Sequence, residues 1–78
     1  MTGRNNTQDL AQRERLVRAF ESFSHILTTN QRQIFHLHYI EDLSLAEIAA
    51  IVATTRSSVY DALQKAYRRL VPLLDGLD

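Results

Sequence analysis

The chain contains no cysteine, and its 78 residues include only two glycines and one proline. Without cysteine it can form neither a disulfide framework nor a thiolate metal site, which fits a reducing compartment. Its apolar runs are far shorter than the roughly 20 residues that cross a bilayer, and residues 1–7 lack the apolar core of a signal peptide. We therefore expect a cytoplasmic protein with no membrane segment.

The chain also lacks a charge surplus, because nine lysines and arginines balance nine acidic residues. A nucleic-acid-binding domain ordinarily carries a basic surplus, so affinity for phosphate has to come from local clustering. One cluster lies in the last third of the chain, where only Asp61 opposes Arg56, Lys65, Arg68 and Arg69. Acidic residues collect elsewhere, at Glu41, Asp42 and Glu47. This distribution permits nucleic-acid binding without requiring it.

Catalysis and metal binding find little support. Gly3 and Gly76 are the only glycines, so the sequence has no glycine-rich loop of the kind that cradles a phosphate, and a thin helical domain offers no deep pocket around a catalytic triad. His36 and His38 are two apart on a predicted helix and point to different faces. We expect His38 at the edge of the core and His36 at the surface. We predict no enzyme, catalytic residue, metal, cofactor or small-molecule substrate.

Apolar spacing predicts an all-α fold with four helices. The first helix covers residues 8–27, with an inner face of Leu16, Val17, Phe20, Phe23 and Leu27. The sequence from Thr28 to Gln31 is a capping box that begins a second helix, which runs to about Ile40 with Ile34, Phe35, Leu37 and His38 inside. We predict one domain over residues 8–74, between a disordered tail of residues 1–7 and a short C-terminal tail of residues 75–78.

Two more caps follow in the second half of the chain. Ser44 and Glu47 form another capping box before a short third helix, whose apolar stripe is Leu45, Ile48, Ala49 and Val52. Thr55 caps a fourth helix that ends near Leu70, or continues with a kink, because Pro72 is poorly placed inside a helix. Its apolar residues recur three and four apart, at Val59, Ala62, Leu63, Ala66 and Leu70.

The third and fourth helices have the spacing of a helix-turn-helix over residues 44–70, because two short helices are joined by a tight turn. Ala49 is the small residue that lets the two backbones approach, and Val59 anchors the second helix. Ala53 occupies the turn position that favours a left-handed backbone, usually a glycine, at a cost of about 1 kcal/mol. Thr54 stands where an aliphatic residue is usual, so the turn packs less apolar area.

In this geometry the start of the fourth helix enters the major groove of DNA. We expect residues at its start to face base edges or adjacent phosphates, namely Thr55, Arg56, Ser57, Ser58 and Asp61. Gln64, Lys65 and Arg68 lie farther along and suit the DNA backbone. Asp61 is an awkward neighbour for phosphate. It either accepts a hydrogen bond from a cytosine amino group or only holds Lys65 at i+4.

The sequence resembles the YlxM family, small bacterial proteins related to the fourth region of sigma factors. The matching residues are Leu27-Thr28, Gln31-Arg32, the run from Tyr39 to Leu45, Glu47-Ile48-Ala49, Arg56 and Val59-Tyr60-Asp61. The resemblance covers residues 17–70. It implies a DNA-binding helix-turn-helix regulator, with a link to the signal recognition particle pathway because the family's genes commonly neighbour those of the particle.

Two departures from the family weaken any transfer of base preference. Ser57-Ser58 stands where the family tends to have Gln-Ala, and Ala62 replaces a residue that is commonly polar. The chain also stops at Asp78, whereas family members often continue into a charged helical extension.

Two further hypotheses about partners stay open. The same helices are suited to bind RNA polymerase or a component of the signal recognition particle. They would do so through the acidic residues Glu41, Asp42 and Glu47 and through Tyr60 and Tyr67. These two tyrosines share a face at the border of the core. An exposed apolar patch formed by the first helix with Val71, Leu73, Leu74 and Leu77 would favour a homodimer, which supplies paired DNA half-sites. A weaker alternative is a fragment of a larger sigma factor.

Overall fold

The computed structural model describes the backbone of residues 2–77 and the side chains of residues 12–74. Its elements, in order, are α1 (Thr2–Phe23), a 3-10 turn η1 (Ser24–Ile26), α2 (Thr29–Phe35), a π-helical segment η2 (His36–Ile40), α3 (Leu45–Ile51), α4 (Arg56–Leu70) and a 3-10 segment η3 (Val71–Leu77). No strand occurs among residues 2–77, and the predicted all-α fold class is confirmed.

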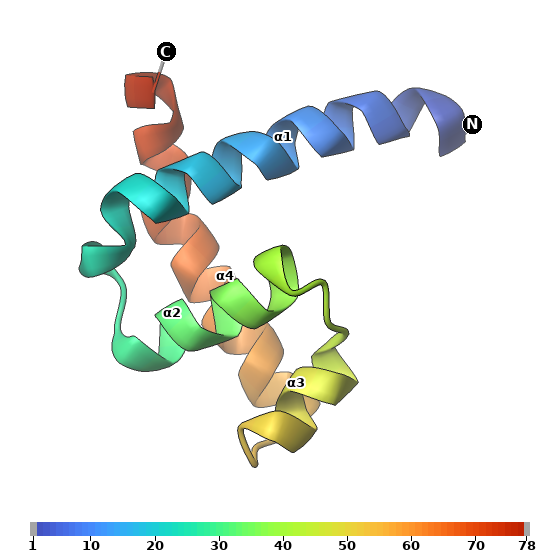
Figure 1. The fold of residues 1–78 in the computed structure, drawn as a ribbon, viewed down its shortest axis with the longest axis vertical. Coiled ribbons are helices and arrows are strands. Elements are labelled where there is room, and N and C mark those ends of the chain that lie inside the picture. Colours follow the sequence, from blue (N-terminus) through green and yellow to red (C-terminus); the bar gives the residue numbers. More distant parts are fainter. Residues whose placement is uncertain (1, 78) are drawn as a thin grey trace.

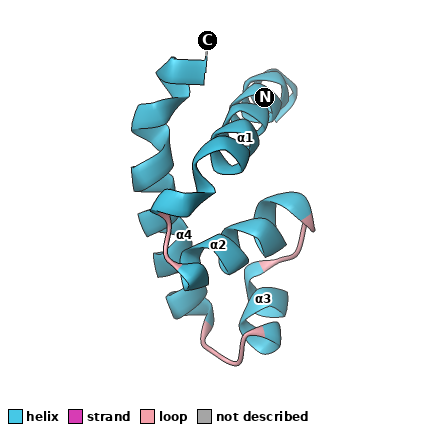
Figure 2. Cartoon of the chain, turned by 60° about the vertical axis from the view of Figure 1, so that its left-hand side comes forward, coloured by secondary structure: helices cyan, strands magenta, loops and turns pink. Residues whose placement is uncertain are grey.

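Among the described side chains, α4 contributes the largest set of buried apolar residues, and the other helices are arranged around it. Figure 1 shows α1 crossing near the C-terminal end of α4, α2 crossing its middle, and α3 lying beside its start. Figure 2 gives the same arrangement from the side, with α1 seen nearly end-on and the loop between α3 and α4 at the far end from both termini. The turn of the helix-turn-helix and the start of α4 therefore lie at the opposite end of the molecule from α1 and η3.

Both predicted capping boxes are present, and each fixes the first turn of a helix. The Thr28 hydroxyl accepts from the Gln31 N–H at 3.1 Å, and the Gln31 side chain accepts from the Thr28 N–H at 3.2 Å. In α3 the Ser44 hydroxyl accepts from the Glu47 N–H at 3.1 Å, and Glu47 Oε1 accepts from the Ser44 N–H at 2.8 Å. Each box satisfies two N–H groups that the helix itself leaves free.

The first helix ends earlier than predicted. α1 stops at Phe23, and the 3-10 turn η1 leads to Leu27, which is extended at φ −92° and ψ 152°. Arg32 holds this turn, because its Nη1 donates to the carbonyls of Ser24 at 3.4 Å and Leu27 at 2.9 Å. The extended Leu27 in turn sets up the Thr28 cap of α2, so the predicted continuous helix to residue 27 is wrong.

The predicted second helix is present but changes type before it ends. α2 passes into η2, where the Glu41 N–H donates to the His36 carbonyl, five residues back, at 3.1 Å. The chain then reverses at Asp42, whose φ is 64°, and the Leu43 N–H donates to the Leu37 carbonyl at 3.0 Å. This wide final turn and left-handed residue resemble a Schellman ending.

Arg13 of α1 fastens that ending. Its Nη2 donates to the Tyr39 carbonyl at 2.9 Å and to Asp42 Oδ1 at 3.0 Å. Its guanidinium also lies 5.7 Å from the centroid of the Tyr39 ring, within the range of a cation–π contact. α1 thereby holds the segment that leads into the helix-turn-helix.

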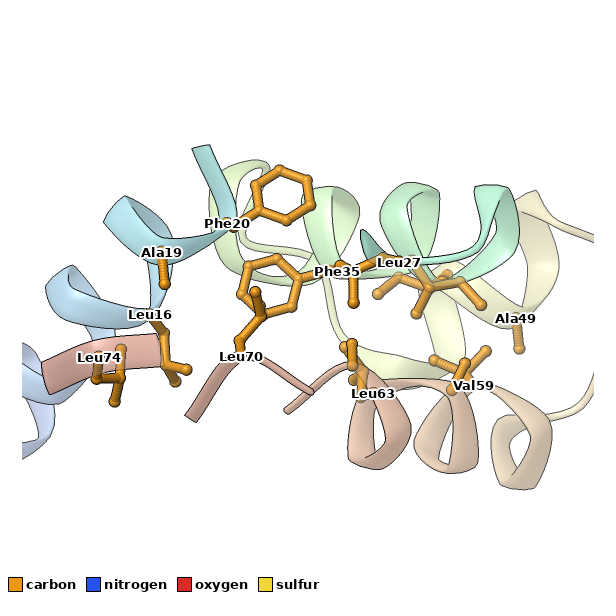
Figure 3. Close-up of a cluster of buried hydrophobic side chains, with 14 residues drawn as sticks. Leu16, Ala19, Phe20, Leu27, Phe35, Ala49, Val59, Leu63, Leu70 and Leu74 are labelled. Carbon is orange, nitrogen blue, oxygen red and sulfur yellow. The ribbon is translucent and has the colours of Figure 1, made fainter. Parts of the chain in front are cut away.

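The buried apolar residues form one cluster that extends from η3 to the helix-turn-helix. All five residues predicted for the inner face of α4 are buried, as are Leu16, Phe20, Ile34, Phe35, Ile48 and Ala49. Figure 3 shows this succession from Leu74 and Leu16 at one end, through Leu70 and Phe35, to Val59 and Ala49 at the other. Phe35 is fully buried and stacks on Phe20, with ring centroids 4.7 Å apart, and on Tyr39 at 4.5 Å.

Other predicted inner positions lie only half inside. Val17, Phe23, Leu37, His38, Leu45 and Val52 are all half-buried. They therefore border the cluster rather than fill it.

The C-terminal segment folds back onto α1. α4 ends at Leu70, as Pro72 predicts, and η3 follows. Leu74 is only 5% exposed, and its carbonyl accepts from Arg15 Nη2 at 3.2 Å. The predicted exposed apolar patch is therefore wrong at Leu74, which packs inside the domain, and the homodimer hypothesis loses that support. The side chain of Leu77 lies outside the described residues.

The helical boundaries also extend beyond the predicted domain. α1 begins at Thr2 rather than at residue 8, and η3 continues to Leu77. The division into a disordered tail of residues 1–7, a domain of residues 8–74 and a tail of residues 75–78 stays a prediction.

Candidate nucleic-acid interface

The turn between α3 and α4 has the backbone predicted for it. Ala53 is left-handed, with φ at 57°. The Val52 N–H donates to the Ile48 carbonyl at 2.9 Å, and the Thr54 N–H donates to the Ala49 carbonyl at 2.9 Å. This six-to-one closure around a left-handed residue is a Schellman motif. Only residues 52–54 therefore separate the end of α3 at Ile51 from Thr55, the cap of α4.

Close packing then fixes the angle between the two helices. Ile48 and Val59 are completely buried, and Ala49 is 7% exposed. Ala49 and Val59 thus occupy the positions predicted for the close approach and the anchor. Thr54 is exposed rather than packed, so the turn contributes little apolar area, as expected from its polar side chain.

Thr55 caps α4 and engages Ser58. Its Oγ1 accepts from the Ser58 N–H at 3.1 Å and donates to Ser58 Oγ at 3.0 Å. The Thr55 hydroxyl therefore both accepts and donates within the first turn, whereas the Ser58 hydroxyl accepts there and keeps its own proton. The N–H groups of Arg56 and Ser57 have no acceptor within the helix, because the first turn of any helix leaves such groups free. They lie at the positive end of the helix dipole, which favours an anion.

The exposed side of α4 has an outer row and two flanks. The outer row consists of Ser57, Asp61, Gln64 and Arg68, spaced four, three and four apart and opposite the buried stripe. Gln64 is half-buried and the other three are exposed. Arg56 and Tyr60 lie on one flank, in a shallow hollow beside Leu45. The remaining flank carries Ser58 and Lys65.

The second flank faces the start of α2. A hollow there is lined by Thr28, Asn30, Gln31, Ser58, Asp61, Ala62 and Lys65. Lys65 Nζ lies 3.1 Å from Asp61 Oδ2 in an i,i+4 ion pair, and both side chains are more than half exposed. The predicted pairing of these two residues is therefore present.

All eight predicted DNA-facing residues belong to α4 or its cap, but they do not all face the same side of the helix. Thr55, Arg56, Ser57, Ser58, Asp61, Lys65 and Arg68 are exposed, and Gln64 is half-buried. Arg69, which belongs to the basic cluster in the sequence, turns the other way and donates to the Ile26 carbonyl at 3.2 Å. The cations left on the exposed side of α4 are Arg56, Lys65 and Arg68.

A groove that the sequence did not predict runs along the flank of α4 that carries Tyr60. It is lined by His38, Tyr39, Leu45, Tyr60, Leu63, Gln64 and Tyr67. Tyr60 and Tyr67 share this flank, as their spacing predicts, and are 55% and 38% exposed. Burial raises the pKa of the Tyr39 phenol above its ordinary 10.0, with Tyr67 acting in the same direction and Arg13 opposing it.

The histidines have local partners. His36 is exposed, and its Nε2 lies 3.2 Å from Glu41 Oε2. His38 is half-buried, with Nδ1 at 2.9 Å from the Leu43 carbonyl. Both exposures are as predicted. Among the described side chains no group of three or more histidine, cysteine or acidic residues is placed to hold a metal ion.

Across the described part of the chain, no helix combines the length and the apolar character needed to cross a membrane.

The described helices thus define a small all-helical protein with a helix-turn-helix. A family model described as "Putative helix-turn-helix protein, YlxM / p13 like" matches residues 10–75, and the chain belongs to this family, UPF0122. The resemblance found in the sequence is confirmed.

The relatives are longer than this chain. A UPF0122 protein of Clostridium kluyveri is 38% identical over 69 residues, which are 88% of this chain and 62% of that protein. One of Caldanaerobacter subterraneus subsp. tengcongensis is 43% identical over 47 residues, covering 60% of this chain and 40% of the relative. One of Ureaplasma urealyticum serovar 10 is 36% identical over 56 residues, covering 72% and 57%. No solved structure matches the chain.

Proposed function

We propose that the chain binds double-stranded DNA with the start of α4 in the major groove, and that it acts as a non-enzymatic transcriptional regulator in the cytoplasm. The observation that carries the proposal is the α3–turn–α4 geometry, in which the left-handed turn at Ala53 and the burial of Ile48 and Val59 in one core cluster leave one side of α4 facing solvent. A helix held in this way has the shape that enters a major groove.

The exposed residues have distinct roles in this proposal. Arg56 and Ser57 lie at the first turn of α4, where their free N–H groups favour a phosphate and their side chains reach base edges. Thr55 and Ser58 hold the cap and line the approach. Gln64, Lys65 and Arg68 contact the DNA backbone farther along, which fixes the orientation of the helix.

The charge of the interface limits the expected affinity. Three cations, Arg56, Lys65 and Arg68, are exposed on this side of α4. If each neutralises one phosphate, the logarithm of the binding constant falls with the logarithm of salt with a slope of about −2.7. Affinity then drops roughly 40-fold between about 50 mM and 200 mM salt.

Fluorescence anisotropy with mixed-sequence duplex DNA at these two salt concentrations tests the proposal. Arg56→Ala is expected to cost about 1–3 kcal/mol if the guanidinium contacts a guanine, and Lys65→Ala is expected to weaken binding to mixed-sequence duplex and make the salt slope shallower. The matched control is Arg18→Ala, which removes an exposed arginine from α1. Equal losses from Arg18→Ala and Arg56→Ala would refute the placement of the interface on α4.

One observation favours a second function, binding to a protein such as RNA polymerase or a signal recognition particle component. The groove beside Tyr60 and Tyr67 exposes aromatic surface, and exposed aromatic residues are enriched at protein interfaces. This alternative is favoured if no duplex binds at low salt and Tyr60→Ala abolishes capture of polymerase or particle components in a pull-down, whereas Arg56→Ala does not.

A further inference from the structure

Asp61 is the only acidic residue of α4, and it lies on the outer row. Ser57 precedes it by one turn and Gln64 follows it by one turn, so all three lie along the line farthest from the core. Its side chain is 64% exposed. A helix that enters a major groove with this row foremost carries the Asp61 carboxylate to the base edges rather than to the solvent.

A carboxylate in that position weakens DNA binding unless it makes a favourable contact with the DNA. It lies between two rows of phosphates, which repel it, and it loses water on entering the groove. Lys65 offsets part of this repulsion, because its Nζ lies 3.1 Å from Asp61 Oδ2. Lys65 itself lies on the flank of α4, on the side of the hollow at the start of α2, where a backbone phosphate would run beside the helix.

The chemistry of the base edges then selects the contact. An ionised carboxylate only accepts hydrogen bonds, and the donors in the major groove are the exocyclic amino groups of cytosine and adenine. Adenine also presents the acceptor N7 beside its amino group, and N7 repels the second carboxylate oxygen. Cytosine presents the amino donor alone, so it is the base that suits Asp61 best.

We propose that Asp61 is a sequence-reading residue of α4, which accepts a hydrogen bond from the amino group of one cytosine while Lys65 links its carboxylate to the flanking phosphate. This inference rests on the proposed DNA-binding function and adds the base that one position of α4 selects. Lys65 is a positioning residue in this arrangement. Its three donors can serve the carboxylate and the phosphate at the same time.

Selection of duplexes from a pool of randomised sequence tests the assignment, with the selected sequences read out for the wild-type chain, Asp61→Asn and Asp61→Ala. The wild-type chain is expected to select cytosine at one position, by about 5- to 150-fold over the other bases. Asp61→Asn is expected to change that preference to adenine, because an amide pairs with both N6 and N7 of adenine. Asp61→Ala is expected to flatten the preference at that position alone.

The matched control is Glu21→Gln, which removes one exposed negative charge from α1 and is expected to leave the selected sequence unchanged. Circular dichroism of each variant reports whether the helices are retained. If Asp61→Asn and Asp61→Ala tighten binding to every duplex equally and the selected sequence stays the same, Asp61 only repels phosphate and the inference is wrong, while the proposed function stands. If the wild-type chain retains no duplex even at low salt, the proposed function itself fails.

Discussion

Replacing Ala53 by glycine is expected to stabilise the protein, although the change removes a methyl group. Ala53 is exposed and left-handed, with φ at 57°. Because Ala53 is exposed and lies outside the buried core, the substitution removes little packing. A residue with a Cβ is strained in this region of the backbone, whereas glycine adopts it freely.

Two opposing terms set the magnitude. Removing the Cβ relieves about 1–2 kcal/mol of left-handed strain, and the extra freedom of glycine in the unfolded chain costs about 0.5–1 kcal/mol. At the midpoints of these two ranges, the net gain in the free energy of unfolding is about 0.75 kcal/mol. Since about 1 kcal/mol moves the Tm of a domain of this size by 4–8 °C, we expect a rise of about 3–6 °C.

Thermal unfolding followed by circular dichroism measures this shift, and Ala50→Gly is the matched control. Ala50 is also exposed but lies inside α3, where glycine costs about 1 kcal/mol relative to alanine. The two substitutions are therefore expected to move Tm in opposite directions. A fall with Ala53→Gly similar to that with Ala50→Gly would refute the left-handed turn and, with it, the geometry of the helix-turn-helix.

Three further predictions concern the other structural features. Ser44→Ala should lower the free energy of unfolding by about 1 kcal/mol through loss of the α3 cap, whereas Ser44→Asp should retain it; equal Tm values for both variants would contradict the capping box. Phe35→Ala should cost about 3–5 kcal/mol in denaturant unfolding, because a fully buried stacked ring leaves a cavity; a cost below about 1 kcal/mol would show that the ring is not in the core. The raised pKa of Tyr39 means that folding favours the neutral phenol, so stability is fully present below the unfolded value of about 10 and is lost as pH rises through the folded pKa. Tyr39→Phe should remove that alkaline loss in urea unfolding measured across this range, and an unchanged pH profile would argue against burial of the phenol.

Local chemistry was sufficient to predict most of the helix-turn-helix. The caps at Ser44 and Thr55 follow from hydroxyl side chains that accept from the first-turn N–H groups. The left-handed Ala53 follows from its place at the end of a short apolar stripe. The buried face of α4 follows from three-to-four spacing, which is a property of the sequence alone.

Features that depend on long-range contacts were not predictable in the same way. Asp42 is left-handed and η2 is π-helical where Arg13, remote in sequence, donates to Tyr39 and Asp42. Leu74 is buried because η3 returns to α1. No local pattern contains these pairings, because they depend on how the helices pack.

The candidate interface likewise combines features that follow from local sequence with features that depend on long-range packing. The spacing of residues on α4 predicts which side chains are exposed, but not which cations have partners elsewhere. Arg69 is exposed and adjacent to Arg68 in the sequence, yet it donates to the Ile26 carbonyl. The groove beside Tyr67 also joins residues from η2, α3 and α4, so it could be found only after these elements had been placed together.

The most direct test of the central proposal is a nuclear magnetic resonance titration of the labelled protein with duplex DNA at low salt. Chemical-shift changes of the backbone amides are expected to concentrate at residues 54–61, where the turn and the first half of α4 meet the groove, and the amide signals of the Ser24–Ile26 turn are expected to stay in place. Shifts that instead concentrate along α1, or that spare α4 altogether, would contradict the proposal.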